Sequence, residues 1–257
     1  KKAKPDKKNN SDEDSKEKSM QTKLASWYLD EAKTKVGKDG FADAAAQVET
    51  AVGKIDAASE KYSAVLLKTQ YLQMLLSHES NSFTADKFIP SKAHGEDQLN
   101  KIVSAADAIL SAIDTDKIKL SLGANVATDD KDGKREREHR EALKGILVDA
   151  LHRKLHAAIS AGNSSLVDET WKEMERWVVK MSKYAVLNYR REVHSERYGH
   201  ALKHLLAMLG GVKDSGGAFP SKFVLWKELS SICNKLGWKS WEDYARISLA
   251  SRFPGKM

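Results

Sequence analysis

Cysteine is almost absent from this sequence. The single residue of this type, Cys233, excludes an internal disulfide and every zinc site built from several cysteines. Such sparse cysteine usage is typical of a reducing compartment. We therefore expect a cytoplasmic protein.

Proline is scarce and long apolar runs are missing. Four prolines among 257 residues and a charged fraction of 31% favour helices over a sandwich or barrel, which would need many short strands and turns. No apolar run reaches the roughly 18 residues that a membrane-spanning helix needs. The basic residues 1–8 lead into polar residues and not into the apolar segment of a signal peptide. The sequence predicts an all-α protein without a membrane-spanning helix and without a signal peptide.

Charge of one sign is nowhere concentrated, although the net charge is +7. A basic protein raises the question of nucleic acid, because lysine and arginine neutralise phosphates. Here acids and bases alternate, as between Lys134 and Glu138, and residues 1–19 mix lysines with five acids. This pattern indicates solvated helix surfaces. We predict neither a nucleic-acid nor a membrane partner.

The chain divides into three parts by composition. Residues 1–20 have almost no apolar content and are predicted to be a disordered, charged linker. An N-terminal helical group over 21–126 and a C-terminal helical group over 134–257 follow, with an acidic, glycine-ended stretch between them. Because the chain starts at Lys1, inside a charged tract, we expect a piece of a longer protein.

Apolar residues recur at intervals of three and four, which places them on one face of a helix. Each apolar stripe needs a partner helix to cover it. The predicted fold is therefore a set of stacked antiparallel helix pairs, α-solenoid-like but irregular, and at most tetratricopeptide-like because no fixed repeat is convincing. Two of the stripes are Tyr62, Val65, Leu66, Thr69, Leu72 and Leu76, and Leu99, Ile102, Val103, Ala106, Ile109 and Ile113.

The C-terminal group gives the clearest boundaries. One helix over 143–158 is expected to stop at Gly162, with a cap for the next helix within 163–165. That next helix carries an apolar face from Val167 to Met181.

A single helix over 187–209 is predicted after it. A last hairpin then turns at Gly237, with Ser240 as the candidate cap of a short final helix.

Two histidine pairs have the spacing of metal ligands on one helix face. His152 and His156 are four residues apart, as are His200 and His204. Arg153 stands where a zinc-peptidase motif needs glutamate. We interpret all four as exposed or flanking histidines of amphipathic helices.

Two loops resemble binding motifs but lack essential residues. The stretch 128–133 resembles the start of a calcium loop, yet His139 replaces its closing glutamate. Gly211 and Gly216 have phosphate-loop spacing, but Gly217–Ala218 stand where lysine and a hydroxyl residue are required. No Gly-x-Ser-x-Gly nucleophile motif occurs. The sequence therefore predicts no catalytic, cofactor-binding or metal-binding residue.

Tryptophans are the remaining signal. Trp171, Trp177 and Trp226 have helical spacing and are interpreted as core residues. Trp238 and Trp241 lie three residues apart near the C-terminus, where large aromatic side chains would anchor an interface.

Several segments, in order, resemble the C-terminal region of the tripeptidyl-peptidase II family of subtilisin-like serine exopeptidases. The set spans roughly residues 100–254, and its order and spacing carry the resemblance more than any one motif. The segments are Ile109–Asp114 with Asp129–Asp130 after it, Leu147–Lys154, Thr170–Trp177, Arg197–Lys203, Leu236–Trp241 and Arg252–Pro254.

The resemblance implies a large cytosolic homo-oligomer that removes tripeptides from the free N-termini of oligopeptides. The family's catalytic Asp, His and Ser lie in an upstream domain, and none maps onto this sequence. We therefore expect a non-catalytic scaffold and assembly region that forms homo-oligomers through helical packing. The alternative is a stand-alone α-helical module that binds a protein partner.

Overall fold

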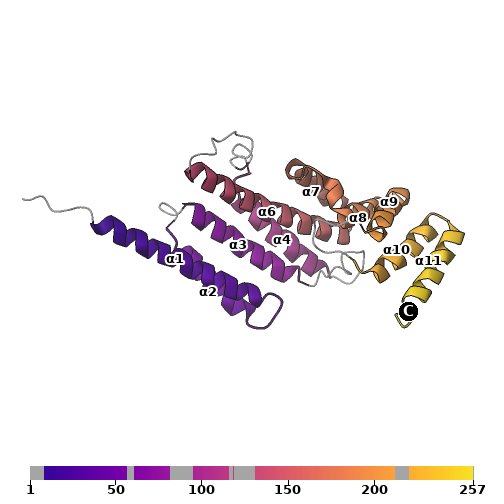
Figure 1. Ribbon diagram of the computed structural model, residues 1–257, viewed down its shortest axis with the longest axis horizontal. Helices are drawn as coiled ribbons and strands as arrows, with labels where there is room; N and C mark the ends of the chain where they lie inside the picture. The colour runs from indigo at the N-terminus through magenta and orange to yellow at the C-terminus, as the bar shows by residue number, and fades with distance from the viewer. Residues whose placement is uncertain are drawn as a thin grey trace, which may run out of the picture. The chain divides into compact units, whose positions relative to one another are not determined.

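The computed structural model describes residues 9–56, 61–81, 95–115, 118, 131–211 and 220–256, and every regular element in these ranges is helical (Figure 1). The predicted all-α class is confirmed. None of the described helices is both long and apolar enough to cross a membrane. The helices are α1 (Asn9–Thr34), α2 (Phe41–Gly53), α3 (Lys61–Glu79), α4 (Glu96–Ala112), α6 (Lys131–Ser160), α7 (Ser164–Trp177), the 3-10 helix η2 (Met181–Lys183), α8 (Ala185–His194), α9 (Tyr198–Leu209), α10 (Lys222–Lys235) and α11 (Lys239–Arg252).

The chain forms two compact units that interleave along the sequence. The first comprises Lys1–Glu79 and Asp107–Leu147, and the second comprises Ser80–Ala106 and Val148–Met257. Of the three dividing points, one follows the end of α3 and two fall inside helices, α4 and α6; none falls in the acidic stretch before residue 134. In addition, α1 already begins at Asn9, within the segment expected to be a linker. The division into a linker and two domains stays a prediction.

The first unit is built on the pair formed by α1 and α2. Alanines at the contact let the two helices approach closely, and the larger side chains of α2 and α3 fill the remaining space. This core consists of Ala25, Leu29, Ala32, Phe41, Ala44, Ala45, Val48, Ala51, Ile55, Leu67 and Met74.

The connection between α1 and α2 depends on two glycines and a distant histidine. Gly37 and Gly40 adopt φ angles of 72° and 76°, in the left-handed region that favours glycine. The Gly37 N–H donates to His78 Nδ1 over 3.2 Å. The His78 ring stacks on Phe41, with 3.8 Å between ring centroids and 2° between planes. The end of α3 therefore holds the turn between α1 and α2.

The apolar faces of α3 and α4 differ from one another. The stripe predicted on α4 is confirmed, because Leu99, Ile102, Ala106 and Ile109 are all buried. In α3, by contrast, only Thr69 and Leu76 of the predicted stripe are buried, together with Leu67 and Met74. Helix α3 is partly covered on several sides, so a single stripe did not describe it.

In the second unit, consecutive helices pack in order. Helix α8 packs on α9, α9 on α10, and α10 on α11. Each presents a buried apolar row, such as Ala201, Leu202, Leu205 and Met208 in α9. The prediction of packed neighbouring helix pairs is confirmed.

The helix limits around Gly162 follow the sequence. Gly162 has a φ angle of 71°, and the Asn163 N–H reaches back to the Ala158 carbonyl over 3.1 Å. Asn163 caps α7, since its side chain accepts a hydrogen bond from the Leu166 N–H at 3.1 Å. Both the predicted stop and the predicted cap region are confirmed.

Three predicted helix limits are wrong: the end of α7, the extent of the helix over 187–209, and the start of the last helix. Helix α7 ends at Trp177, where Val178 turns to an extended conformation, and does not reach Met181. The expected helix over 187–209 is two helices, because Glu196 adopts a φ angle of 56° and the Arg197 N–H bonds the Glu192 carbonyl over 2.8 Å.

Ser240 does not cap the last helix. It lies inside the first turn of α11, which begins one residue earlier with Trp238 at the capping position and extends over 14 residues. The predicted stop at Gly237, with a φ angle of 71°, is confirmed.

Replacing the α7 cap tests this local structure. Asn163→Ala removes the acceptor for the Leu166 N–H and is expected to lower the free energy of unfolding by about 1 kcal/mol. Asn163→Asp keeps a side-chain acceptor and should retain the native stability. Urea unfolding followed by circular dichroism measures both variants; equal losses in the two would contradict the capping role.

Candidate functional site: a polar network around α8

Helix α8 carries a fully buried arginine, Arg190, whose side chain has no solvent exposure. Its Nη1 bonds His156 Nδ1 over 2.6 Å, and its Nη2 donates to Ser160 Oγ over 2.7 Å. Both acceptors belong to α6. In the described chain no carboxylate bonds this guanidinium directly, and its Nε has no hydrogen-bond partner. A buried cation is costly, so these acceptors fix how α8 packs on α6.

The histidines of α6 extend this contact inward. His152 Nε2 and His156 Nε2 are 3.1 Å apart, and the two rings are nearly perpendicular, at 84°. Because a guanidinium only donates, His156 accepts at Nδ1 and carries its proton on Nε2. That proton points at His152 Nε2, which accepts it. The geometry thus assigns one direction to the chain of donors: Arg190 to His156 to His152.

Burial keeps both rings neutral. It lowers the pKa of His152 to about 4, although nearby Asp149 acts in the opposite direction. Burial, and then the neighbouring His152 and Arg190, hold the pKa of His156 well below its ordinary value. Burial also lowers the pKa of Arg190 to about 9, so the guanidinium stays charged at neutral pH.

The interpretation of this pair as exposed histidines is wrong. His152 and His156 are only 4% and 1% exposed. The apolar stripe seen in the sequence suggested one buried face, whereas nearly every residue from Ala150 to Ile159 is buried. A sequence pattern cannot show that a helix is covered on several sides. In the other pair His200 is exposed, as expected.

The buried pair is a hydrogen-bonded contact. Its two Nε2 atoms face one another, and the positive charge of Arg190 is adjacent. Across the described parts of the chain, no cluster of three or more His, Cys, Asp or Glu residues could hold a metal ion. Asp132 and Gly133, from the stretch compared with a calcium loop, lie in the first turn of α6, and 128–130 lie outside the described residues. Gly216 and 217–218 of the glycine loop also lie outside them.

A second buried contact joins α8 to α10. The Tyr189 hydroxyl donates to Glu228 Oε2 over 2.6 Å. Burial raises the pKa of Glu228 above its usual range, and the tyrosine hydrogen bond and Arg190 act against that increase. Burial also raises the pKa of Tyr189. The tyrosine stays neutral and remains the donor.

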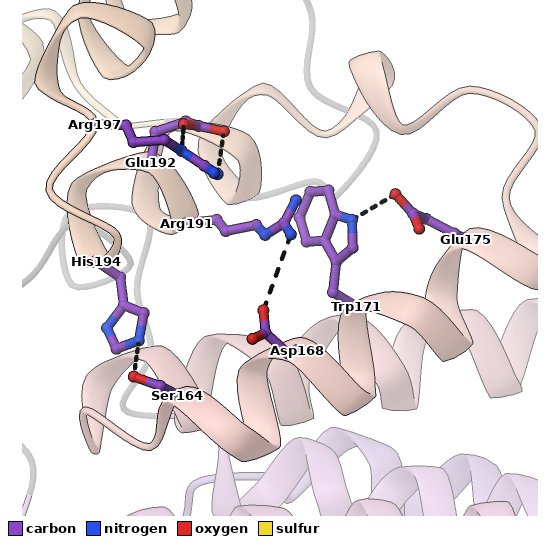
Figure 2. A network of polar contacts seen from close by, with 8 residues as sticks. All are labelled: Ser164, Asp168, Trp171, Glu175, Arg191, Glu192, His194 and Arg197. Carbon is purple, nitrogen blue, oxygen red and sulfur yellow. Dashed lines mark hydrogen bonds and ion pairs between the residues drawn. The ribbon is translucent and has the colours of Figure 1, made fainter.

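Toward α7, the network reaches the surface (Figure 2). The Arg191 guanidinium lies 4.0 Å from the centroid of the Trp171 ring, in a cation–π contact, and 4.0 Å from Asp168 Oδ1. Trp171 Nε1 donates to Glu175 over 2.6 Å. These contacts pack the arginine stem and the indole between the two helices.

The turn after α8 is held by an ion pair within it (Figure 2). Arg197 bonds both oxygens of Glu192, at 2.6 and 3.1 Å. Glu196, the residue with the left-handed backbone, lies between them in sequence. His194, the last residue of α8, contacts the first residue of α7: its Nε2 lies 3.1 Å from Ser164 Oγ. The sequence did not predict these pairings, and the only signal of Glu192, His194 and Arg197 as a group is an unusually polar stretch between two apolar rows.

Tryptophan exposure completes the picture of the surface. Trp171 and Trp177 are buried, as predicted, and Trp226 is partly buried. Trp238 and Trp241 are 47% and 58% exposed. Separately, in the first unit, α1 exposes a row of three apolar side chains: Met20, Leu24 and Trp27.

These features define a helical-array protein in which polar contacts fix the packing of neighbouring helices. The chain is similar to tripeptidyl-peptidase 2 of Oryza sativa subsp. japonica, with 26% identity over 181 residues, which is 65% of this chain and 13% of the relative. It is equally similar to tripeptidyl-peptidase 2 of Arabidopsis thaliana, with 26% identity over 170 residues, or 60% of this chain and 12% of the relative. No family model matches the chain, and neither does any solved structure.

The predicted resemblance is thus confirmed as a distant relationship. The matched part covers only about an eighth of each relative's length, at 13% and 12%.

The buried histidines predict acid sensitivity. In the unfolded chain each histidine binds a proton below a pKa of about 6.5, whereas folded His152 does so only near 4, so folding is disfavoured as the pH falls between these values. We expect a loss of about 2 kcal/mol from His152 between pH 7 and pH 5.

Variants isolate this effect from the opposite contribution of Glu228, whose raised pKa favours the folded state as the pH falls. Urea unfolding at both pH values should show a clearly smaller loss for His152→Gln than for the native chain. His200→Gln, at an exposed position, should leave the loss unchanged. Identical pH dependence in all three proteins would contradict the neutral, buried state of His152.

Proposed function

We propose that this chain is a non-catalytic helical scaffold and assembly region of a tripeptidyl-peptidase 2-like serine exopeptidase, which releases tripeptides from the free N-terminus of oligopeptides. The observation that carries the proposal is the 26% identity to two tripeptidyl-peptidase 2 relatives over 65% and 60% of the chain. The peptide bond would be cleaved in a part of the protein that these residues do not supply.

The contribution of this region would be geometric. Helices fixed by buried polar contacts supply a rigid surface, and subunits packed through such surfaces restrict which substrates reach a catalytic centre. Two features support this role: the Arg190 contacts that fix α8 on α6, and the exposed apolar row of Met20, Leu24 and Trp27 on α1. Apolar side chains on a surface mark interaction sites when they are contiguous. We place the assembled protein in the cytoplasm, as a homo-oligomer.

Depletion from a native extract tests the proposal. An antibody against this chain should remove a tripeptide-releasing activity that elutes as a very large complex in size-exclusion chromatography. The activity should require a free N-terminus on the substrate and should be lost to a serine-directed inhibitor.

The same experiment separates the proposal from its alternative, a stand-alone helical module that binds a protein partner. An antigen of about this chain's length, with the activity left in the depleted extract, would contradict the peptidase assignment and favour the module.

The isolated chain gives a second test. If it is non-catalytic, the purified and folded 257-residue chain should release no tripeptide from an oligopeptide that the native complex cleaves. Circular dichroism confirms that the tested sample is helical. Cleavage by the isolated chain, abolished by a serine-directed inhibitor, would overturn this part of the proposal.

A further inference from the structure

The end of the second unit carries a cluster of aromatic side chains between α10 and α11. Phe223 and Phe253 make an edge-to-face contact with 5.6 Å between centroids. Tyr244 makes similar contacts with Trp226, at 6.2 Å, and with Trp241, at 5.8 Å. We call these five residues the C-terminal aromatic surface. Trp241 and Tyr244 are 58% and 51% exposed, so half or more of each side chain remains open to solvent.

Cations border this surface. The Arg252 guanidinium lies 5.1 Å from the Trp226 ring centroid, and Lys256 Nζ lies 6.0 Å from that of Phe223. Lys222 and Lys227 are exposed and stand next to Phe223 and Trp226 in sequence.

The acids of α11 do not neutralise these cations. Glu242 and Asp243 are both paired with Lys239 Nζ, each at 3.3 Å. The aromatic surface therefore combines apolar area with an excess of positive charge.

We infer that the C-terminal aromatic surface docks an acidic peptide segment that also carries apolar side chains. Aromatic side chains supply most of the contact energy of small interfaces. The bordering arginine and lysines would attract carboxylates, orient the segment and exclude basic competitors. The inference rests on these contacts and does not depend on the proposed peptidase function.

Two other occupants fit the surface less well. A two-fold contact between two copies would place the same positive border against itself, and like charges oppose such a contact. Stacked nucleobases need open ring faces, whereas Arg252 and Lys256 lie over the Trp226 and Phe223 rings and Trp241 meets Tyr244 edge to face. The methyl and methylene groups of a peptide's apolar side chains, unlike nucleobases, pack on ring edges as well as on ring faces.

Fluorescence anisotropy with the 257-residue chain tests the inference. The probe is a short labelled peptide in which glutamate alternates with leucine and phenylalanine, and the reference is the same peptide with lysine in place of glutamate. We expect the acidic peptide to bind at least tenfold more tightly, with an affinity that falls as salt rises. Trp241→Ala should weaken binding roughly tenfold, and Arg252→Glu with Lys256→Glu by at least as much.

Matched variants exclude nonspecific effects. Trp27→Ala removes a tryptophan of similar exposure, 59%, from the other unit, and Lys172→Glu with Lys203→Glu reverses two exposed charges on α7 and α9. Neither should change the affinity. Equal losses from target and control variants would overturn the inference, as would equal binding of the two peptides.

Two further results would also overturn it. One is tighter binding of a single-stranded oligonucleotide that displaces the acidic peptide. The other is self-association of the chain that Trp241→Ala abolishes.

Discussion

A guanidinium without a carboxylate bonded to it is the constraint on which the second unit depends. Arg190 is completely buried and can only donate hydrogen bonds, so the groups facing it must accept. His156 and Ser160 of α6 do so, and this requirement fixes the tautomer of His156 and, through it, that of His152. Any sliding of α8 along α6 would leave a buried charge without acceptors. Such a loss costs several kcal/mol, more than most apolar contacts of one side chain. The contact of Arg190 with His156 and Ser160 therefore sets the register of α8 on α6, and the apolar side chains around it fill the remaining space.

The same helix reaches four neighbours through four consecutive residues. Each step along an α-helix turns the side chain by about 100°, so four residues in sequence point in four directions. Tyr189 contacts α10, Arg190 contacts α6, Arg191 contacts α7, and Glu192 holds the turn into α9. A helix that is polar on every side would normally be solvated. Here Tyr189, Arg190 and Arg191 each meet a partner on a different helix, and Glu192 meets Arg197 in the turn, so α8 is central to the packing of this unit despite its short length.

How far the sequence predicts this structure depends on how many sides of a helix are covered. The stripe of α4, the stop at Gly162, the Asn163 cap and the turn at Gly237 were all predicted, because each depends on local periodicity or backbone conformation. The failures have two causes: coverage of a helix by other elements, and side-chain pairs that the pattern of apolar residues does not show. His152 and His156 were assigned to the surface because the pattern of α6 suggests one buried face, whereas other helices cover it on several sides. The break at Glu196 was missed because glutamate rarely adopts a left-handed backbone, and only the Arg197–Glu192 contacts explain it. Of the polar network, the sequence therefore showed composition but not pairing.

The distribution of polar and aromatic groups in the second unit separates two roles. The titratable groups with strongly shifted pKa values are buried and hydrogen-bonded inside the unit: Arg190 to His156, His156 to His152, and Tyr189 to Glu228. Such buried pairs suit the packing of helices. Catalytic groups need contact with a substrate, and shifted pKa values alone do not distinguish catalysis from buried structural networks. The aromatic side chains of Trp241 and Tyr244, by contrast, face solvent. A buried polar centre and an open aromatic end are properties that support the proposed role of a region that positions other polypeptide segments.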